Sequence, residues 1–140
     1  MAAPVELLKK IPLFSELEGK ELQTLAQSFK ERTFEAGSNV ATEGSGGVGF
    51  FVIGEGEAGV TVHGEERATL GPGQYFGEVA LIDEGSRTAT IVAKTDLTCY
   101  GLTAWEFRPL VESNGAIAWK LLQALAKRLR AADEKKSPEG

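Results

Sequence analysis

The middle of the chain combines many glycines with short runs of β-branched and aromatic residues, and this pattern restricts the possible folds most. Most of the 17 glycines of the 140-residue chain lie between Lys30 and Leu102. Turn signals rather than helical spacing separate the apolar runs, so the strands are connected without long helices. The pattern predicts an all-β jelly roll or barrel, not a parallel sheet. The expected strands are Lys30–Phe34, Asn39–Thr42, Gly49–Ile53, Ala58–His63, Arg67–Leu70, Arg87–Ala93 and Leu97–Thr103.

Segments with helical spacing of apolar residues flank this β region. Before it we expect two short helices that cap the core, separated at Pro12, with the second from about Gly19 to Ser28. After it the spacing predicts a helix over Thr103–Val111 and a long amphipathic helix over Ile117–Ala132, whose narrow apolar stripe suits closing over the barrel or pairing with a second copy. The expected organisation is one domain over residues 1–132 (cap 4–29, β-roll 30–102, hinge and lid helices 103–132) and a disordered tail over 133–140.

Composition excludes several classes of protein. Fifteen basic against 20 acidic side chains give a net charge of −5, which argues against a nucleic-acid partner. Cys99 is the only cysteine and His63 the only histidine, so disulfide scaffolds and clustered zinc sites are excluded. No apolar run is long enough for a membrane span, and no signal-peptide pattern begins the chain. We expect a cytoplasmic protein without membrane contact, with His63 exposed in a turn and Cys99 buried in a strand.

The segment Gly54–Gly59 is a literal GxGxxG, the spacing found in dinucleotide-binding and kinase phosphate loops. A dinucleotide site needs a helix directly after the glycines, but Val60–Val62 continues as a strand. The downstream motifs of a kinase are also missing. We therefore interpret this segment as a hairpin whose glycines supply positive φ angles.

The segment from Tyr75 to Thr90 carries the chemistry. Phe76 and Gly77 end a strand, and Glu78–Leu81 can form one helical turn whose free N–H groups attract an anion. Arg87 follows in the next strand and can donate two parallel hydrogen bonds to a phosphate, although it can also pair with nearby acids. Glu78 must accept hydrogen bonds instead. A ribose phosphate satisfies both groups.

The run Phe-Gly-Glu-Val-Ala-Leu, followed after five residues by Arg-Thr-Ala-Thr, resembles the phosphate-binding cassette of the cyclic-nucleotide-binding domain family. Catabolite activator proteins and cAMP-dependent kinase regulatory subunits belong to this family. The resemblance covers about Gly49 to Val111, and the flanking helices match the family's helical subdomain. It implies a double-stranded β-helix (jelly roll or β-roll) with an N-terminal helical cap, a short cassette helix and two C-terminal helices.

The resemblance also implies roles for individual residues. Glu78 would bind the ribose 2′-hydroxyl, Arg87 the exocyclic phosphate oxygens, and the N–H groups of Ala80 and Thr88 the remaining oxygen, while Gly77 lets the ribose approach closely. The residues implied beside the ligand or in the base pocket are Val60, Val62, Val79, Ala89, Arg128 and Ala132.

Ser86 replaces the proline that is common before the cassette arginine, which predicts a less rigid loop. Two other features leave the nucleotide open: Ala131-Ala132-Asp133 stands where catabolite activators place hydroxyls on adenine, and Thr88 resembles the threonine of cGMP-selective members. We expect cAMP in preference to cGMP.

No catalytic constellation stands at a workable spacing, so we expect neither an enzyme nor a cofactor. Only a charged tail follows the long helix where catabolite activators carry a helix-turn-helix, so DNA binding is not expected. The sequence predicts a stand-alone cyclic-nucleotide sensor that signals through the last helix to an unidentified protein partner or a homodimer. The alternative is a scaffold of the same fold that has lost its ligand response.

Overall fold

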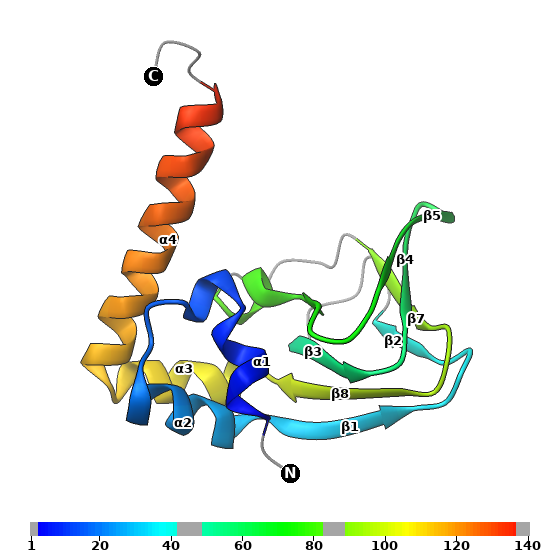
Figure 1. Cartoon of the computed structure of the whole chain (residues 1–140), viewed down its shortest axis with the longest axis horizontal. Coiled ribbons are helices and arrows are strands. Elements are labelled where there is room, and N and C mark those ends of the chain that lie inside the picture. The colour runs from blue at the N-terminus through cyan, green and yellow to red at the C-terminus, as the bar shows by residue number, and fades with distance from the viewer. Residues whose placement is uncertain (1–2, 42–48, 83–88, 137–140) are drawn as a thin grey trace.

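The computed structural model describes residues 3–41, 49–82 and 89–136. Within these ranges, helices gather at one end of the molecule and two antiparallel sheets form the other (Figure 1). The helices are α1 (Val5–Lys9), α2 (Gly19–Ser28), α3 (Ala104–Glu112) and α4 (Gly115–Lys136), with short 3₁₀ turns η1 (Pro12–Phe14) and η2 (Glu78–Leu81). The strands are β1 (Lys30–Phe34), β2 (Asn39–Ala41), β3 (Phe50–Glu55), β4 (Ala58–Val62), β5 (Glu65–Leu70), β6 (Tyr75–Phe76), β7 (Thr90–Ala93) and β8 (Leu97–Leu102).

The order of the strands confirms the predicted jelly roll. One sheet has the order β1-β8-β3-β6 and the other β2-β7-β4-β5, and every neighbouring pair is antiparallel. The chain therefore crosses between the sheets after β1, β2, β3, β5, β6 and β7. Such crossings place strands that are far apart in sequence side by side, as where β1 pairs with β8 along its whole length.

The sheet β1-β8-β3-β6 separates two hydrophobic cores because side chains alternate across a strand. Ile53 on β3 faces the other sheet and packs in a core with Cys99 and Ile91. Phe50, also on β3, faces the helices and meets Phe14 and Phe29 edge-to-face at centroid distances of 5.8 and 5.9 Å. The N-terminal helices thus cap the core as expected.

Two sequence interpretations are wrong. The GxGxxG segment does not form a hairpin, because β3 and β4 lie in different sheets and each pairs with other strands. One glycine of the segment, Gly56, does have the expected positive φ, with a value of 90°. In addition, α4 does not end at Ala132 but continues to Lys136, so the first residues of the expected disordered tail are helical.

Other expectations hold. His63 is exposed in the two-residue turn between β4 and β5, where its φ of 52° and the 78° of Gly64 match a type I′ hairpin. Cys99 is buried, and this burial raises the pKa of its thiol to about 12. No helix in the described ranges has the length and apolarity to cross a membrane.

Candidate functional site

The loop between β6 and η2 has the shape that the motif predicts. β6 pairs with β3 through Phe76 and Tyr75, and Gly77 then adopts φ 84°, a value that favours glycine. Glu78–Leu81 form the expected single turn, which is a 3₁₀ helix. Leu81 is buried in the core between the helices and the sheet. The turn is thereby anchored to the helical end of the molecule.

Glu78 is the most unusual polar residue of this loop. Its side chain is only 13% exposed, and its Oε1 lies 3.3 Å from Nη1 of Arg128 on α4. Oε2 is buried and has no hydrogen-bond partner among the described residues. Burial raises the pKa of Glu78, and the ion pair with Arg128 opposes this effect. A buried acceptor without a donor is costly, so Oε2 is a candidate atom for accepting a hydrogen bond from a bound group.

The structure brings only some of the predicted site residues together. Glu78 and Arg128 are in contact, although the sequence resemblance placed Arg128 beside the base rather than beside Glu78. Val60 lies on β4 and packs against the core between the sheets. Val62 on β4 and Ala89 are both half-buried, whereas Ala132 is exposed on the part of α4 that projects from the body (Figure 1).

The remaining predicted residues are described in part or lie outside the described ranges. Val79 and Ala80 belong to η2, but only their backbone is described. Arg87 and Thr88 lie outside the described residues. Their roles toward a ligand stay predictions.

The sequence offered no signal for the contact between Glu78 and Arg128. The two residues are 50 positions apart, and the packing of α4 against η1 and α3 brings them together. Their opposite charges are ordinary for a loop and an exposed helix face.

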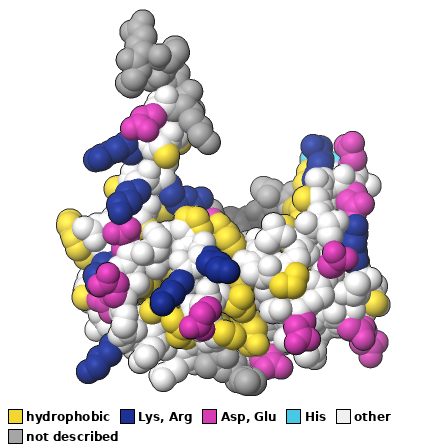
Figure 2. All heavy atoms as spheres, in the orientation of Figure 1, with side chains coloured by type: hydrophobic (Ala, Val, Ile, Leu, Met, Phe, Trp, Pro, Cys, Tyr) yellow, Lys and Arg dark blue, Asp and Glu magenta, His cyan; other side chains and the backbone are white. Residues whose placement is uncertain are grey.

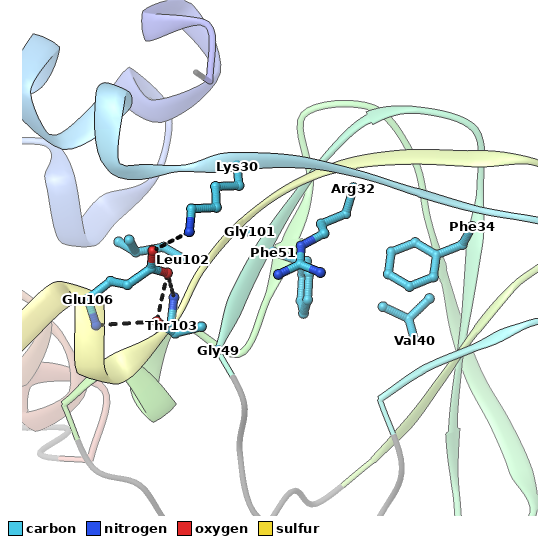
Figure 3. A pocket seen from close by; sticks show the side chains of 10 residues that line it. All are labelled: Lys30, Arg32, Phe34, Val40, Gly49, Phe51, Gly101, Leu102, Thr103 and Glu106. Atoms are coloured by element: carbon cyan, nitrogen blue, oxygen red, sulfur yellow. Dashed lines mark hydrogen bonds and ion pairs between the residues drawn. The ribbon is translucent and has the colours of Figure 1, made fainter. Parts of the chain in front are cut away.

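A hollow of about 210 Å³ lies against strands β1, β8 and β3 of the first sheet, with Val40 of β2 on its other side (Figure 3). Phe34, Val40 and Phe51 form its apolar part. At its other end Glu106 accepts hydrogen bonds from Thr103 at the start of α3 and pairs with Lys30 of β1 at 3.1 Å. None of the described site residues predicted from the sequence lines it.

No group of three or more potential metal-ligating side chains occurs within the described part of the chain. The fold thus combines an antiparallel β-roll, helices at one end, and a glycine with positive φ beside a largely buried acid. Comparisons with known proteins identify the class of domain. The model of the family described as "Cyclic nucleotide-binding domain" matches residues 31–114.

Two relatives and one solved structure illustrate the similarity. The cAMP-dependent protein kinase regulatory subunit of Yarrowia lipolytica is 45% identical over 92 residues, which cover 64% of this chain and 24% of that protein. The Cyclic AMP receptor protein of Thermus thermophilus is 33% identical over 131 residues, 90% of this chain and 61% of that protein. The N-terminal domain of a transcriptional regulator from Streptomyces coelicolor A3(2) superposes with a TM-score of 0.85 at 32% identity, covering 91% of this chain and 95% of that one.

This chain therefore belongs to the cyclic nucleotide-binding domain family, as its cassette motif predicted, and is a regulatory domain of that family. It spans a quarter or less of the kinase regulatory subunits that it matches and 61% of the Cyclic AMP receptor protein.

Proposed function

We propose that this chain binds cAMP in preference to cGMP and reports the bound state through α4. The observation that carries the proposal is the buried, unpartnered Oε2 of Glu78 beside the positive φ of Gly77. A ribose 2′-hydroxyl is a neutral donor of the right kind for this oxygen. The names of two matched relatives, the kinase regulatory subunit and the receptor protein, both refer to cAMP.

The phosphate is assigned to Arg87 and to the backbone N–H groups of Ala80 and Thr88. This assignment rests on the cassette motif and on membership of the family. The charge balance supports it, because Glu78 repels an anion and a phosphate needs a cation on the other side of the loop.

Transmission is assigned to the core that η2 shares with the last two helices. Leu81 of η2, Phe107 of α3 and Ile117 of α4 are all buried in this core. A shift of η2 on ligand binding therefore changes the packing of both helices. The ligand can favour a new arrangement only by binding it more tightly than the resting one.

The recipient of the signal is proposed to be a protein surface that meets α4, in a partner or a second copy. Trp119, Leu122 and Leu129 are each more than half exposed and recur at spacings that keep them on one face of the helix. If the recipient is a second copy of this chain, the sedimentation coefficient is expected to rise with protein concentration. The coefficient of Leu129→Glu is then expected to be lower than that of the wild type. A scaffold that has lost its ligand response would give the same sedimentation result but would bind no nucleotide.

The decisive experiment is calorimetric titration of cAMP and cGMP into nucleotide-free protein. We expect cAMP to bind more tightly, and Arg87→Ala to weaken binding by about a hundredfold, because charge-assisted hydrogen bonds contribute about 1.5–3 kcal/mol each. Arg67→Ala is the matched control, since Arg67 is an exposed arginine of β5 that pairs only with Glu65 among the described residues. Absence of binding to the wild type contradicts the proposal and favours the scaffold.

A further inference from the structure

Three ion pairs join α4 to other parts of the molecule in the described ranges. Lys120 contacts Glu21 of α2 at 2.6 Å, and Lys127 contacts Glu16, in the turn after η1, at 2.7 Å. Arg128 contacts Glu78 of η2 at 3.3 Å. The N-terminal helical segment and the candidate nucleotide site are thus both tied to the same helix.

The apolar packing of α4 ends before the last two of these ion pairs. Ile117, Leu121 and Ala124 are buried against the body, whereas residues 126–134 are all exposed. Lysine and arginine side chains line the part of α4 that stands clear of the body (Figure 2). Lys127 and Arg128 are therefore the last residues of α4 with an ion pair to the body among the described residues, and they lie beyond the buried residues of the helix.

Lys127 and Arg128 are consecutive, so their side chains leave the helix axis about 100° apart. They reach two different elements, the turn that contains Glu16 and the turn that contains Glu78. A helix held at one of these contacts cannot rotate about its axis without breaking the other. The contact with Glu16 therefore constrains where the guanidinium of Arg128 lies.

The position of Arg128 matters for the chemistry of Glu78. The positive charge of the Arg128 guanidinium lies beside Oε1 and favours the ionised form of the carboxyl group. Oε2 remains an acceptor without a hydrogen-bond donor among the described residues. Within the described residues, the other titratable group facing this carboxylate is Tyr75 of β6, which stays neutral at ordinary pH and whose pKa is raised further, first by its burial. Arg128 is thus the described cation that opposes the effect of burial and favours the ionised form of Glu78.

We propose that the ion pair between Glu16 and Lys127 is a positioning contact that holds Arg128 on Glu78, so that the N-terminal helical segment helps to set the affinity for nucleotide. This inference rests on the proposed function of Glu78. Glu16 and Lys127 touch no ligand in this scheme and act through Arg128.

The test compares Lys127→Met with Lys120→Met, two lysines of α4 that each bind an acid of the N-terminal segment. An exposed ion pair is weak, so we expect Lys127→Met to reduce cAMP affinity by about two- to fivefold. Lys120→Met leaves the affinity unchanged, because Lys120 lies where buried residues already fix α4. In an Arg128→Met background, Lys127→Met causes no further loss of cAMP affinity. A double variant that exchanges the two charges, Glu16→Lys with Lys127→Glu, restores the wild-type affinity.

A readout without nucleotide separates this inference from the proposed function. The pKa of the Glu78 carboxyl, followed by carbon NMR, is expected to be higher in Lys127→Met than in the wild type and unchanged in Lys120→Met. An unaltered Glu78 titration in Lys127→Met overturns the positioning role. So does an affinity loss that persists in the Arg128→Met background or appears equally in Lys120→Met. Wild-type protein that binds no cyclic nucleotide overturns the proposed function instead.

Discussion

Glu78 is held in an environment that disfavours its charged form. Burial raises its pKa in the folded state, whereas an unfolded chain leaves the carboxyl near its ordinary value of 4.5. The folded state therefore binds this proton more tightly, and the ionised form destabilises the fold at neutral pH. A buried polar group without its partner is a common feature of sites that are completed by a ligand.

Glu78→Gln is accordingly expected to stabilise nucleotide-free protein at pH 7.5 while weakening cAMP binding. The stability gain should shrink as the pH falls through the raised pKa of Glu78 toward 4.5, because the wild-type carboxyl becomes neutral too. Urea unfolding at several pH values measures the first effect and calorimetry the second. A variant that is less stable than the wild type at pH 7.5 would show that Glu78 is a structural acid.

For single residues, the sequence predicted the local geometry of the loop around Gly77 and missed the contact of Glu78 with Arg128. Gly77 and the single turn at Glu78 follow from neighbouring residues, so the motif was sufficient to place them. The partner of Glu78 depends on how α4 crosses η1, which no local pattern contains.

Among the elements, α3 has the most completely bonded start. Thr103 Oγ1 accepts a hydrogen bond from the N–H of Glu106 at 3.2 Å and donates to Glu106 Oε1 at 2.7 Å. The same carboxylate accepts from the N–H of Thr103 at 3.2 Å, which completes a capping box. The hydrogen bond from the Thr103 side chain is the largest cause that lowers the pKa of Glu106.

Thr103→Ala is expected to cost about 1 kcal/mol of unfolding free energy at pH 7, the usual effect of losing a helix cap. A carboxyl with a lowered pKa stabilises the fold above its unfolded value, and this stability is lost as the pH falls through the folded pKa. The difference between wild type and Thr103→Ala should therefore shrink below pH 4.5. Thr103→Ser keeps the hydroxyl and is the control in the same urea titrations. An equal loss in both variants would mean that the methyl group, not the cap, matters.

The two errors in predicting the elements have physical causes. Turn residues around Gly56 mark where β3 ends, but a local signal does not tell which sheet the next strand joins. The charged residues Asp133–Lys136 suggested a tail, yet glutamate and lysine are good helix formers, and α4 continues through them.

For the whole molecule, the shared sheet implies a single unfolding transition. β3 contributes Phe50 to one core and Ile53 to the other, so damage to either face weakens the same strand. Both tryptophans lie on the helical side, Trp105 in α3 and Trp119 in α4, far in sequence from Ile53.

Ile53→Ala, which empties part of the core between the sheets, is expected to cost about 2–5 kcal/mol. Because the cores are coupled, tryptophan fluorescence and far-ultraviolet circular dichroism should shift together to lower urea concentration. Ile82→Ala removes an exposed side chain and should change the midpoint little. A fluorescence transition that stays in place while the dichroism shifts would reveal two independent units.

The unsupported portion of α4 also has a mechanical consequence. The segment from Leu129 to Lys136 is about 12 Å long and begins directly after the ion pairs that Lys127 and Arg128 make with the body. A tilt of about 10° about a pivot at these ion pairs, beside Glu78, would displace the tip of α4 by about 2 Å. Because displacement grows with distance from the pivot, the motion caused by a small rearrangement around Glu78 is largest where α4 is farthest from it.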